Sequence, residues 1–232
     1  MAAEIRPKRL YLFDIDGTLI TSGGAGVNSF TEAVHDFCGG TTALQGINFA
    51  GNTDTGIARS VLTAAGMPPT AANIMGLLDA YLAILPKRIG LHEGRLLPGI
   101  ITILDNLKER PDCILALLTG NLAAGAEVKL THYGVWHYFA FGAYADDHHV
   151  RNELGPVAMA RALEEHGEEF TANRIYVIGD TPRDIECGKA FGGVTVAVAT
   201  GKYSHEELAS HSPDFLFDDF SDPDAVLAAI AP

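Results

Sequence analysis

The chain has 232 residues, of which 47% are hydrophobic, and 29 Asp and Glu against 16 Lys and Arg give a formal charge of −13 at pH 7. This length and composition are typical of a globular protein with one large domain or two small ones. The acidic excess argues against a nucleic-acid-binding protein and against binding to an anionic membrane surface, because both need basic patches.

Cysteine usage and apolar runs indicate the compartment. Cys38, Cys113 and Cys187 are scattered without a CxxC spacing, which favours free thiols in a reducing compartment, so a cytoplasmic protein is expected. The first residues hold no apolar stretch long enough for a signal peptide, and no uncharged apolar run reaches the roughly 20 residues of a membrane-spanning helix. The sequence predicts neither secretion nor membrane insertion.

The first predicted elements are one strand and a helical segment. Residues 10–13 are a short apolar run between charged residues, the pattern of a strand buried on both faces. Residues 21–97 hold five acids and four bases, so they are nearly neutral within an acidic chain, and they contain no convincing strand. Apolar residues at helical spacing predict three helices in this segment, at residues 23–39, 54–65 and 71–89. Residues 21–97 are therefore predicted to be an all-helical insert.

Strands and helices alternate after residue 97. Helices are predicted at residues 98–110, 122–133, 155–166 and 182–190, and strands at 113–118, 139–142, 175–178 and 194–198. This alternation predicts an α/β fold with a doubly wound, mainly parallel sheet, built from residues 1–20 and 98–232. Residues 203–232 contain seven acids and no Lys or Arg, which indicates a solvated face.

Polar clusters follow three of the predicted strands. They are Asp14-Ile15-Asp16-Gly17-Thr18, Thr119-Gly120-Asn121 and Gly179-Asp180-Thr181-Pro182-Arg183-Asp184. Because the carboxyl ends of parallel strands line one crevice, these clusters should converge. Four carboxylates at close range need a compensating cation, and a hard divalent ion such as Mg²⁺ prefers oxygen ligands. The four carboxylates expected to lie together around such a cation are those of Asp14, Asp16, Asp180 and Asp184.

The three clusters resemble the first, second and fourth motifs of the haloacid dehalogenase-like hydrolase superfamily, whose commonest members are Mg²⁺-dependent phosphatases. The helical insert after the first motif is similar to the cap of the phosphoglycolate phosphatase and β-phosphoglucomutase branch. The resemblance covers nearly the whole chain. It implies a Rossmann-like core with an inserted helical cap at residues 21–97, and a phosphoric monoester hydrolase that acts on a small phosphorylated metabolite.

The resemblance also implies the roles of the carboxylates. Asp14 would be the nucleophile that becomes an aspartyl phosphate, and a carboxylate suits this role because it is ionised at neutral pH. Asp16 would protonate the leaving oxygen and later deprotonate water, for which its pKa would need raising. The Mg²⁺ ligands would be the carboxylates of Asp14 and Asp180 and the backbone carbonyl of Asp16, with Asp184 acting directly or through a water.

Phosphate-binding residues are expected at the second and third motifs. Thr119, with the backbone N–H groups of Gly120 and Asn121, would hold the phosphoryl oxygens at a helix N-terminus. The family's third motif is usually a Lys, and residues 146–156 contain none. Arg151 is the best substitute, since it is always charged and can grip two phosphate oxygens. Lys129 lies too early, on the preceding helix.

The cap and one loop supply further candidates. Asn52, Thr53 and Arg59 are candidate substrate contacts in the cap. The run Asp146-Asp147-His148-His149 has zinc-type ligands, but a solvated loop beside the site is the favoured interpretation, because consecutive residues rarely chelate one ion.

Three alternatives stay open at this point. A dehalogenase would not need Asp16, Asp180 or Asp184, so their presence counts against it. A phosphomutase of the same superfamily remains compatible, and so does a catalytically weak binding or regulatory relative, because the usual Lys is absent. Phosphoglycolate, a sugar phosphate and a nucleotide monophosphate are all compatible substrates, and the sequence does not indicate the oligomeric state.

Overall fold

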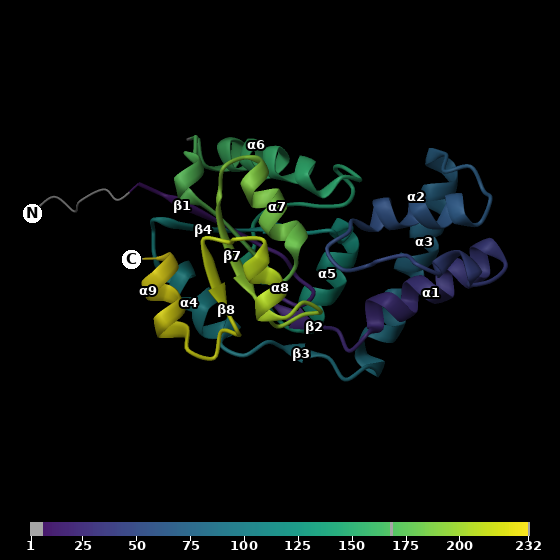
Figure 1. The fold of residues 1–232 in the computed structure, drawn as a ribbon, viewed down its shortest axis with the longest axis horizontal. Helices are drawn as coiled ribbons and strands as arrows, with labels where there is room; N and C mark the ends of the chain where they lie inside the picture. Colours follow the sequence, from purple (N-terminus) through teal and green to yellow (C-terminus); the bar gives the residue numbers. More distant parts are fainter. Residues whose placement is uncertain (1–6, 168, 232) are drawn as a thin grey trace, which may run out of the picture.

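A parallel sheet forms the centre of the molecule in the computed structural model, which describes residues 7–167 and 169–231 (Figure 1). Its six strands lie in the order β5-β4-β1-β6-β7-β8, and every neighbouring pair is parallel. The strands are β1 (Arg9–Phe13), β4 (Cys113–Leu118), β5 (Gly142–Ala143), β6 (Ile175–Gly179), β7 (Val194–Val198) and β8 (Phe215–Phe217). The predicted α/β class and doubly wound sheet are confirmed.

Helices cover both faces of this sheet. Tyr11 and Phe13 of β1 belong to the hydrophobic cluster that includes side chains of α4 (Ile100–Glu109), α5 (Ala123–His132) and α9 (Pro223–Ile230). Leu10 and Leu12 belong to a second cluster with α6 (Leu154–His166) and α7 (Pro182–Ala190), while α8 (His205–Ser210) packs through Leu208. Burial on both faces explains why β1 is an unbroken apolar run. Short 3₁₀ turns occur at Thr42–Leu44, Ile89–Leu91, Trp136–Tyr138, Arg151–Glu153 and Ala172–Arg174.

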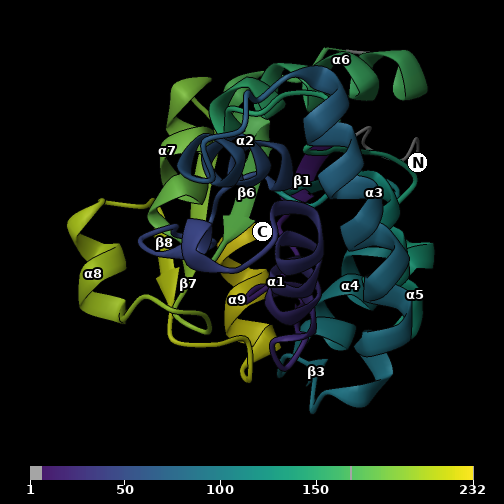
Figure 2. The same ribbon diagram turned by 90° about the vertical axis from the view of Figure 1, so that its right-hand side faces the viewer.

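Three helices lie at one end of the molecule, around a hydrophobic cluster of their own (Figures 1 and 2). They are α1 (Ala25–Cys38), α2 (Asp54–Ala64) and α3 (Ala71–Arg88). We keep the name cap for residues 21–97, which contain them, and the name core for the rest. The two connections between cap and core pair as short antiparallel strands, β2 (Ile20–Thr21) and β3 (Arg95–Leu96). The prediction that no strand lies within residues 21–97 was wrong at this junction, because two-residue strands leave no periodic pattern.

Two other predictions differ from the structure. The strand expected at residues 139–142 is β5 at Gly142–Ala143, and Phe139 instead packs its side chain into the core. Residues 203–232, which were expected to form a solvated face, also supply α8, β8 and α9. Their acids do face solvent, whereas apolar side chains among them are buried: Leu208, Phe220, Val226 and Ile230.

None of the helices within the described residues is long and apolar enough to cross a membrane.

Candidate active site

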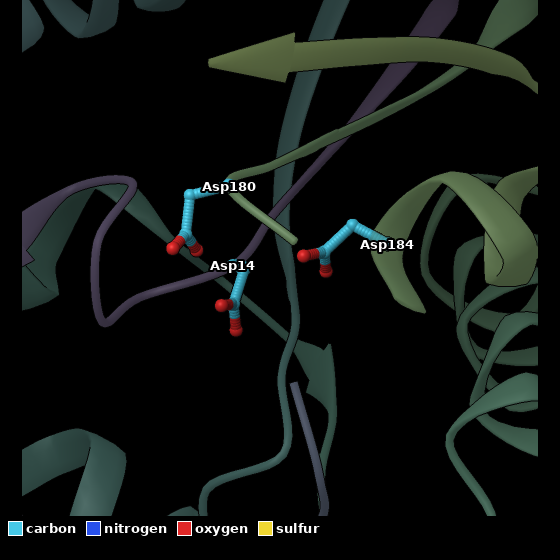
Figure 3. Close-up of side chains that lie close together, drawn as sticks. All are labelled: Asp14, Asp180 and Asp184. Atoms are coloured by element: carbon cyan, nitrogen blue, oxygen red, sulfur yellow. The ribbon is translucent and has the colours of Figure 1, made fainter. Parts of the chain in front are cut away.

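Three buried carboxylates meet at the carboxyl ends of β1 and β6 (Figure 3). Asp14 directly follows β1, Asp180 directly follows β6, and Asp184 lies in the first turn of α7. One carboxylate oxygen from each lies within 4.8 Å of the other two, and the residues are 6%, 4% and 2% exposed. Over residues 7–167 and 169–231 this is the one such group of metal-ligating side chains. The topology therefore unites residues more than 160 positions apart.

Hydrogen bonds at the start of α7 hold the Asp184 side chain in position. Thr181 precedes α7 and Pro182 opens it, while the Asp184 carboxylate accepts hydrogen bonds from the Thr181 backbone N–H at 3.0 Å and from its hydroxyl at 2.7 Å. This capping arrangement satisfies an orphan donor of the helix N-terminus. The second oxygen of Asp184 remains directed at the site, where it pairs with an arginine.

Electrostatics in the group favour a cation. Burial raises the pKa of Asp14 to about 6, and the Asp184 and Asp16 carboxylates add to the rise although Arg151 opposes it. Burial and the Asp184 and Asp14 carboxylates raise the pKa of Asp180 well above its usual range. A positive ion bound beside these carboxyls would favour their ionised form and oppose both shifts.

Two glycines lie directly against the Asp180 carboxylate. A Cβ atom at Gly17 would lie 2.3 Å from Asp180 Oδ2, and one at Gly201 would lie 1.7 Å from the same atom. Only glycine fits at both positions, so the backbone approaches the carboxylate closely from two sides. An all-oxygen donor set in such a cradle fits a hard cation of the Mg²⁺ type.

Arg151 lies against this group. Its Nη2 is 3.1 Å from Asp14 Oδ1 and 2.5 Å from Asp184 Oδ1, and the residue is 4% exposed. Burial alone would lower the pKa of Arg151, but the Asp184 and Asp14 carboxylates outweigh it and raise the value. The guanidinium also donates to the backbone carbonyls of Leu118 and Gly51, so it links the core to the cap.

Asp16 lies outside the group of three acids and has partners of its own. It pairs with Lys129, whose Nζ lies 2.5 Å from Asp16 Oδ2 and 2.6 Å from Asn121 Oδ1, and Asn121 Nδ2 donates to Asp16 at 3.0 Å. Burial would raise the pKa of Asp16, but Lys129, Asn121 and Ser22 together lower it. The expectation that four carboxylates cluster is thus met for three, and the shift of Asp16 is opposite to the one its proton-donating role needs.

The second motif forms the turn between β4 and α5. Thr119 is fully buried, and its hydroxyl accepts from the backbone N–H and the side-chain amide of Asn121. A Cβ atom at Gly120 would lie 2.1 Å from the carbonyl oxygen of Asn52, and the Gly120 carbonyl accepts from the backbone N–H of Asp54 at 2.7 Å. The start of α2 therefore rests directly on the second motif.

A cavity of about 610 Å³ separates the cap from the core at this point. Asn52 lines it, whereas Thr53 serves the fold: its hydroxyl caps α2 and donates to the His149 carbonyl. Arg59 is exposed and outside the cavity lining, because helical periodicity turns it away from the face of α2 that carries Ile57. Of the three cap candidates, one reaches the cavity.

Lys129 and Asp54 line the cavity but were not among the predicted site residues. Lys129 was set aside for its position in the chain, yet it falls on the same stripe of α5 as Leu122 and Ala126, which are buried. A lysine on an apolar stripe is rarely buried without a partner, and that signal was available in the sequence. Asp54 is the first residue of α2, where an acid looks like ordinary helix chemistry.

The two acids of the loop at residues 146–149 hold neighbouring structure in place. Asp146 accepts from the Ala123 backbone N–H at the start of α5, and Asp147 forms a two-pronged pair with Arg161. These carboxylates brace the loop and contribute to no metal-ligating group among the described residues.

Comparison with known proteins agrees with the motifs. The family described as haloacid dehalogenase-like hydrolase matches residues 11–198. The chain is 28% identical over 227 residues to pyrophosphatase PpaX of Bacillus pumilus, covering 94% of this chain and 95% of that protein. It is 26% identical over 220 residues to phosphoglycolate phosphatase of Vibrio cholerae, covering 91% and 93%. A solved hydrolase from Pseudomonas syringae has a TM-score of 0.71 at 19% identity, over 97% of this chain and all of that one. The match from β1 to β7 confirms the resemblance, and the chain belongs to the haloacid dehalogenase-like hydrolases.

Proposed function

We propose that the protein is a Mg²⁺-dependent phosphatase that hydrolyses a small phosphorylated metabolite through an aspartyl-phosphate intermediate. The observation that carries the proposal is the buried group of Asp14, Asp180 and Asp184 with the Arg151 guanidinium 3.1 Å from Asp14. Relatives named phosphoglycolate phosphatase and pyrophosphatase support phosphoryl chemistry.

Mg²⁺ would be held by the carboxylates of Asp14 and Asp180, the backbone carbonyl of Asp16 and, directly or through a water, Asp184. When bound, the ion neutralises negative charge on the phosphoryl oxygens. Arg151 adds a second positive charge at the same place, and its planar guanidinium can grip two phosphoryl oxygens where the family usually has a Lys.

The residues then divide the reaction into two half-reactions. In the first, a carboxylate oxygen of Asp14 bonds to phosphorus as the ester P–O bond breaks, and Asp16 gives a proton to the departing alcohol oxygen. In the second, Asp16 takes a proton from water, the water oxygen bonds to phosphorus, and the bond to Asp14 breaks to release inorganic phosphate. Thr119 and the N–H groups of Gly120 and Asn121 hold the phosphoryl oxygens at the start of α5.

Lys129 bears on the proton transfers. Its ammonium favours the ionised form of Asp16, which is the form that takes a proton from water in the second half-reaction. The first half-reaction requires the protonated form, so it requires a weaker Lys129–Asp16 pair when substrate is bound. Lys129 is on this view a positioning residue that acts through Asp16.

The cap, residues 21–97, closes the site from the other side and excludes bulk water. The start of α2 supplies this closure through the hydrogen bond from Asp54 to Gly120 and the contact of Asn52 with the same glycine. Asn52 is the cap residue from the sequence prediction that we retain as a substrate contact.

The test is turnover of p-nitrophenyl phosphate with Mg²⁺ by the wild-type protein and by Asp14→Asn, which keeps size but removes the nucleophile. We expect kcat to fall at least about 1,000-fold. Asp147→Asn is the matched control, since that carboxylate braces a loop. Unchanged turnover in Asp14→Asn would remove Asp14 from the mechanism.

Two other functions make different predictions in the same assay. A phosphomutase would be activated by a sugar bisphosphate and would release little phosphate. A binding or regulatory relative would bind phosphate or a phosphorylated metabolite without Mg²⁺-dependent turnover.

A further inference from the structure

The two sides of the cavity have opposite chemistry. The core side presents Asp14, Asp16, Asp180, Lys129 and Arg151. The cap side presents polar residues, among them Ser22, Asn48 and Asn52, and six bulky apolar or aromatic side chains. The six are Val27 and Phe30 of α1, Ile47 and Phe49 of the segment before α2, Ile57 of α2 and Tyr81 of α3. We call these six residues the apolar roof.

The apolar roof has a closed back and an exposed front. Phe30 and Tyr81 are each 2% exposed, and their ring centroids lie 5.4 Å apart. The ring of Phe49 meets Phe30 edge-on at 5.6 Å, and Phe49 and Ile47 are only half-buried. Val27 is 46% exposed although it lines the cavity. Apolar surface turned into a cavity, rather than onto the outside, is the feature of a ligand site.

The cap side offers no positive charge to a second anionic group on the substrate. Within residues 21–97, all of which the structure describes, Asp54 is the only charged residue in the lining. The four basic residues of the cap lie outside the lining: Arg59, Lys87, Arg88 and Arg95. A carboxylate or a second phosphate on the leaving group would therefore meet a carboxylate of the cap and no cation of the cap.

The two buried cations of the core side are already paired with carboxylates. Arg151 pairs with Asp14 and Asp184, and Lys129 pairs with Asp16 and Asn121. Lys202 is exposed and donates to Asn48 across the cavity edge at 3.4 Å. Mg²⁺ and Arg151 together account for one phosphoryl group, and the rest of the cavity is lined by the apolar roof and by uncharged polar residues of the cap such as Ser22 and Asn48.

Size points the same way. About 610 Å³ lies within the range of pockets that enclose ligands of drug size, roughly 300–1,000 Å³. A two-carbon leaving group such as glycolate would leave most of this volume to water. The apolar roof would then stay hydrated, which is unfavourable for apolar side chains.

We infer that the substrate is a phosphomonoester whose leaving group is uncharged and apolar, with a bulk near that of an aromatic ring, seated against the apolar roof. This inference rests on the proposed phosphatase function and names the substrate class of that site. Edge-to-face contact with Phe30 and Phe49 would favour a ring over an open chain of equal area.

The test compares three phosphomonoesters of primary alcohols, so that the bond broken is alike: 2-phenylethyl phosphate, glycerol 1-phosphate and 2-phosphoglycolate. We expect kcat/KM for 2-phenylethyl phosphate to exceed the other two by at least about tenfold in the presence of Mg²⁺. Equal or faster hydrolysis of glycerol 1-phosphate or 2-phosphoglycolate would overturn the inference and leave the phosphatase function intact.

Variants place the preference in the roof. In Phe49→Ser we expect kcat/KM for 2-phenylethyl phosphate to fall about fivefold or more, while kcat/KM for glycerol 1-phosphate stays near its wild-type value, so that the ratio of the two falls. Met75→Ser, on the exposed side of α3 and 62% exposed, controls for the loss of an apolar side chain in the cap and should keep the wild-type ratio. An unchanged ratio in Phe49→Ser counts against the roof.

A binding measurement separates this inference from the proposed reaction. Calorimetry with Mg²⁺ compares 3-phenylpropylphosphonate with 3-phosphonopropionate, the non-hydrolysable counterparts of the apolar and the acidic substrate. If no phosphate ester is hydrolysed but the phenyl compound binds at least about tenfold more tightly, the proposed function fails and the apolar leaving-group site stands. Equal affinity, or no binding of either, overturns the inference.

Discussion

The core side and the cap side of the cavity differ in how their positions are held. On the core side, charged groups hold one another: Arg151 lies between Asp14 and Asp184, and Lys129 lies between Asp16 and Asn121. On the cap side, apolar packing and a few backbone contacts hold the roof over the core. Loss of one partner in a buried charge pair leaves the other uncompensated, whereas loss of one roof contact is shared among neighbours. The core side should therefore be sensitive to single changes and the cap side tolerant.

Among the partners of the catalytic carboxylates, Arg151→Met on the core side should have the largest effect. This change removes the cation next to Asp14 and leaves buried carboxylates unpaired, so we expect kcat to fall about 100- to 1,000-fold with Mg²⁺ present. Steady-state kinetics with p-nitrophenyl phosphate measures it. Arg161→Met, which breaks a more exposed pair with Asp147, is the control and should stay within about threefold of wild type. A similar small effect in Arg151→Met would contradict the role given to the guanidinium.

Lys129→Met should have the next largest effect. Loss of the ammonium removes a group that keeps the pKa of Asp16 low, so the acidic limb of the kcat profile should move to higher pH and kcat at neutral pH should fall about tenfold. Lys108→Met, on the surface of α4, should leave the profile unchanged. If Lys129 only filled space, the variant would lower thermal stability without moving the pH profile.

The pairing of Lys129 with Asp16 could not be predicted from the motifs. Motifs at strand ends located Asp14, Asp180 and Asp184, because parallel topology alone brings strand ends together. The partners of Asp16 depend on the direction of one side chain, and spacing along the chain says nothing of it. Lys129 stands eight residues after Asn121, yet two turns of α5 return it to the same amide.

The helices of the cap could be predicted from the sequence, whereas the last strand of the sheet could not. The helices of the cap follow from their apolar stripes, and their predicted bounds agree with α1, α2 and α3 within two residues at each end. The exposure of Arg59 followed from the phase of the helix and could have been predicted. The strand β8 could not have been predicted in the same way. Its three residues are too few to show a periodic pattern, and they form a strand only by pairing with β7.

The stabilisation of the protein by Mg²⁺ should depend on pH, because the ion would bind titrating carboxyls of the core side. A carboxyl whose pKa is raised in the folded state favours folding while it is protonated, and this contribution is lost as the pH rises through about 6 for Asp14. The metal-free protein therefore loses stability from pH 5 to pH 7.5, and Mg²⁺, which needs ionised carboxylates, should restore it. We expect the Mg²⁺-induced rise in Tm to be about 3 °C or more larger at pH 7.5 than at pH 5.

Asp180→Asn provides the control for that measurement, because it removes the carboxyl whose pKa is raised most clearly by burial and by its two neighbours. The pH dependence of the Mg²⁺ effect should shrink in this variant. An equal Mg²⁺ effect at both pH values in the wild-type protein would show that the ion binds elsewhere.

The smallest effect should come from Gly51→Ala, at a contact that holds the cap side. Gly51 has a φ of +69°, and a Cβ atom there would lie 2.5 Å from Thr181 Oγ1 of the core. Gly46 has a φ of +77° with nothing within 4 Å of its Cβ position, so Gly46→Ala carries the same backbone strain, about 1 kcal/mol, without the steric contact. Both variants should lose stability, Gly51→Ala at least as much as Gly46→Ala, but only Gly51→Ala should raise KM, about threefold, because it alone pushes the cap from the core. Equal KM values in the two variants would mean that the roof adjusts to the change, and the cap side would then be more tolerant than its contacts indicate.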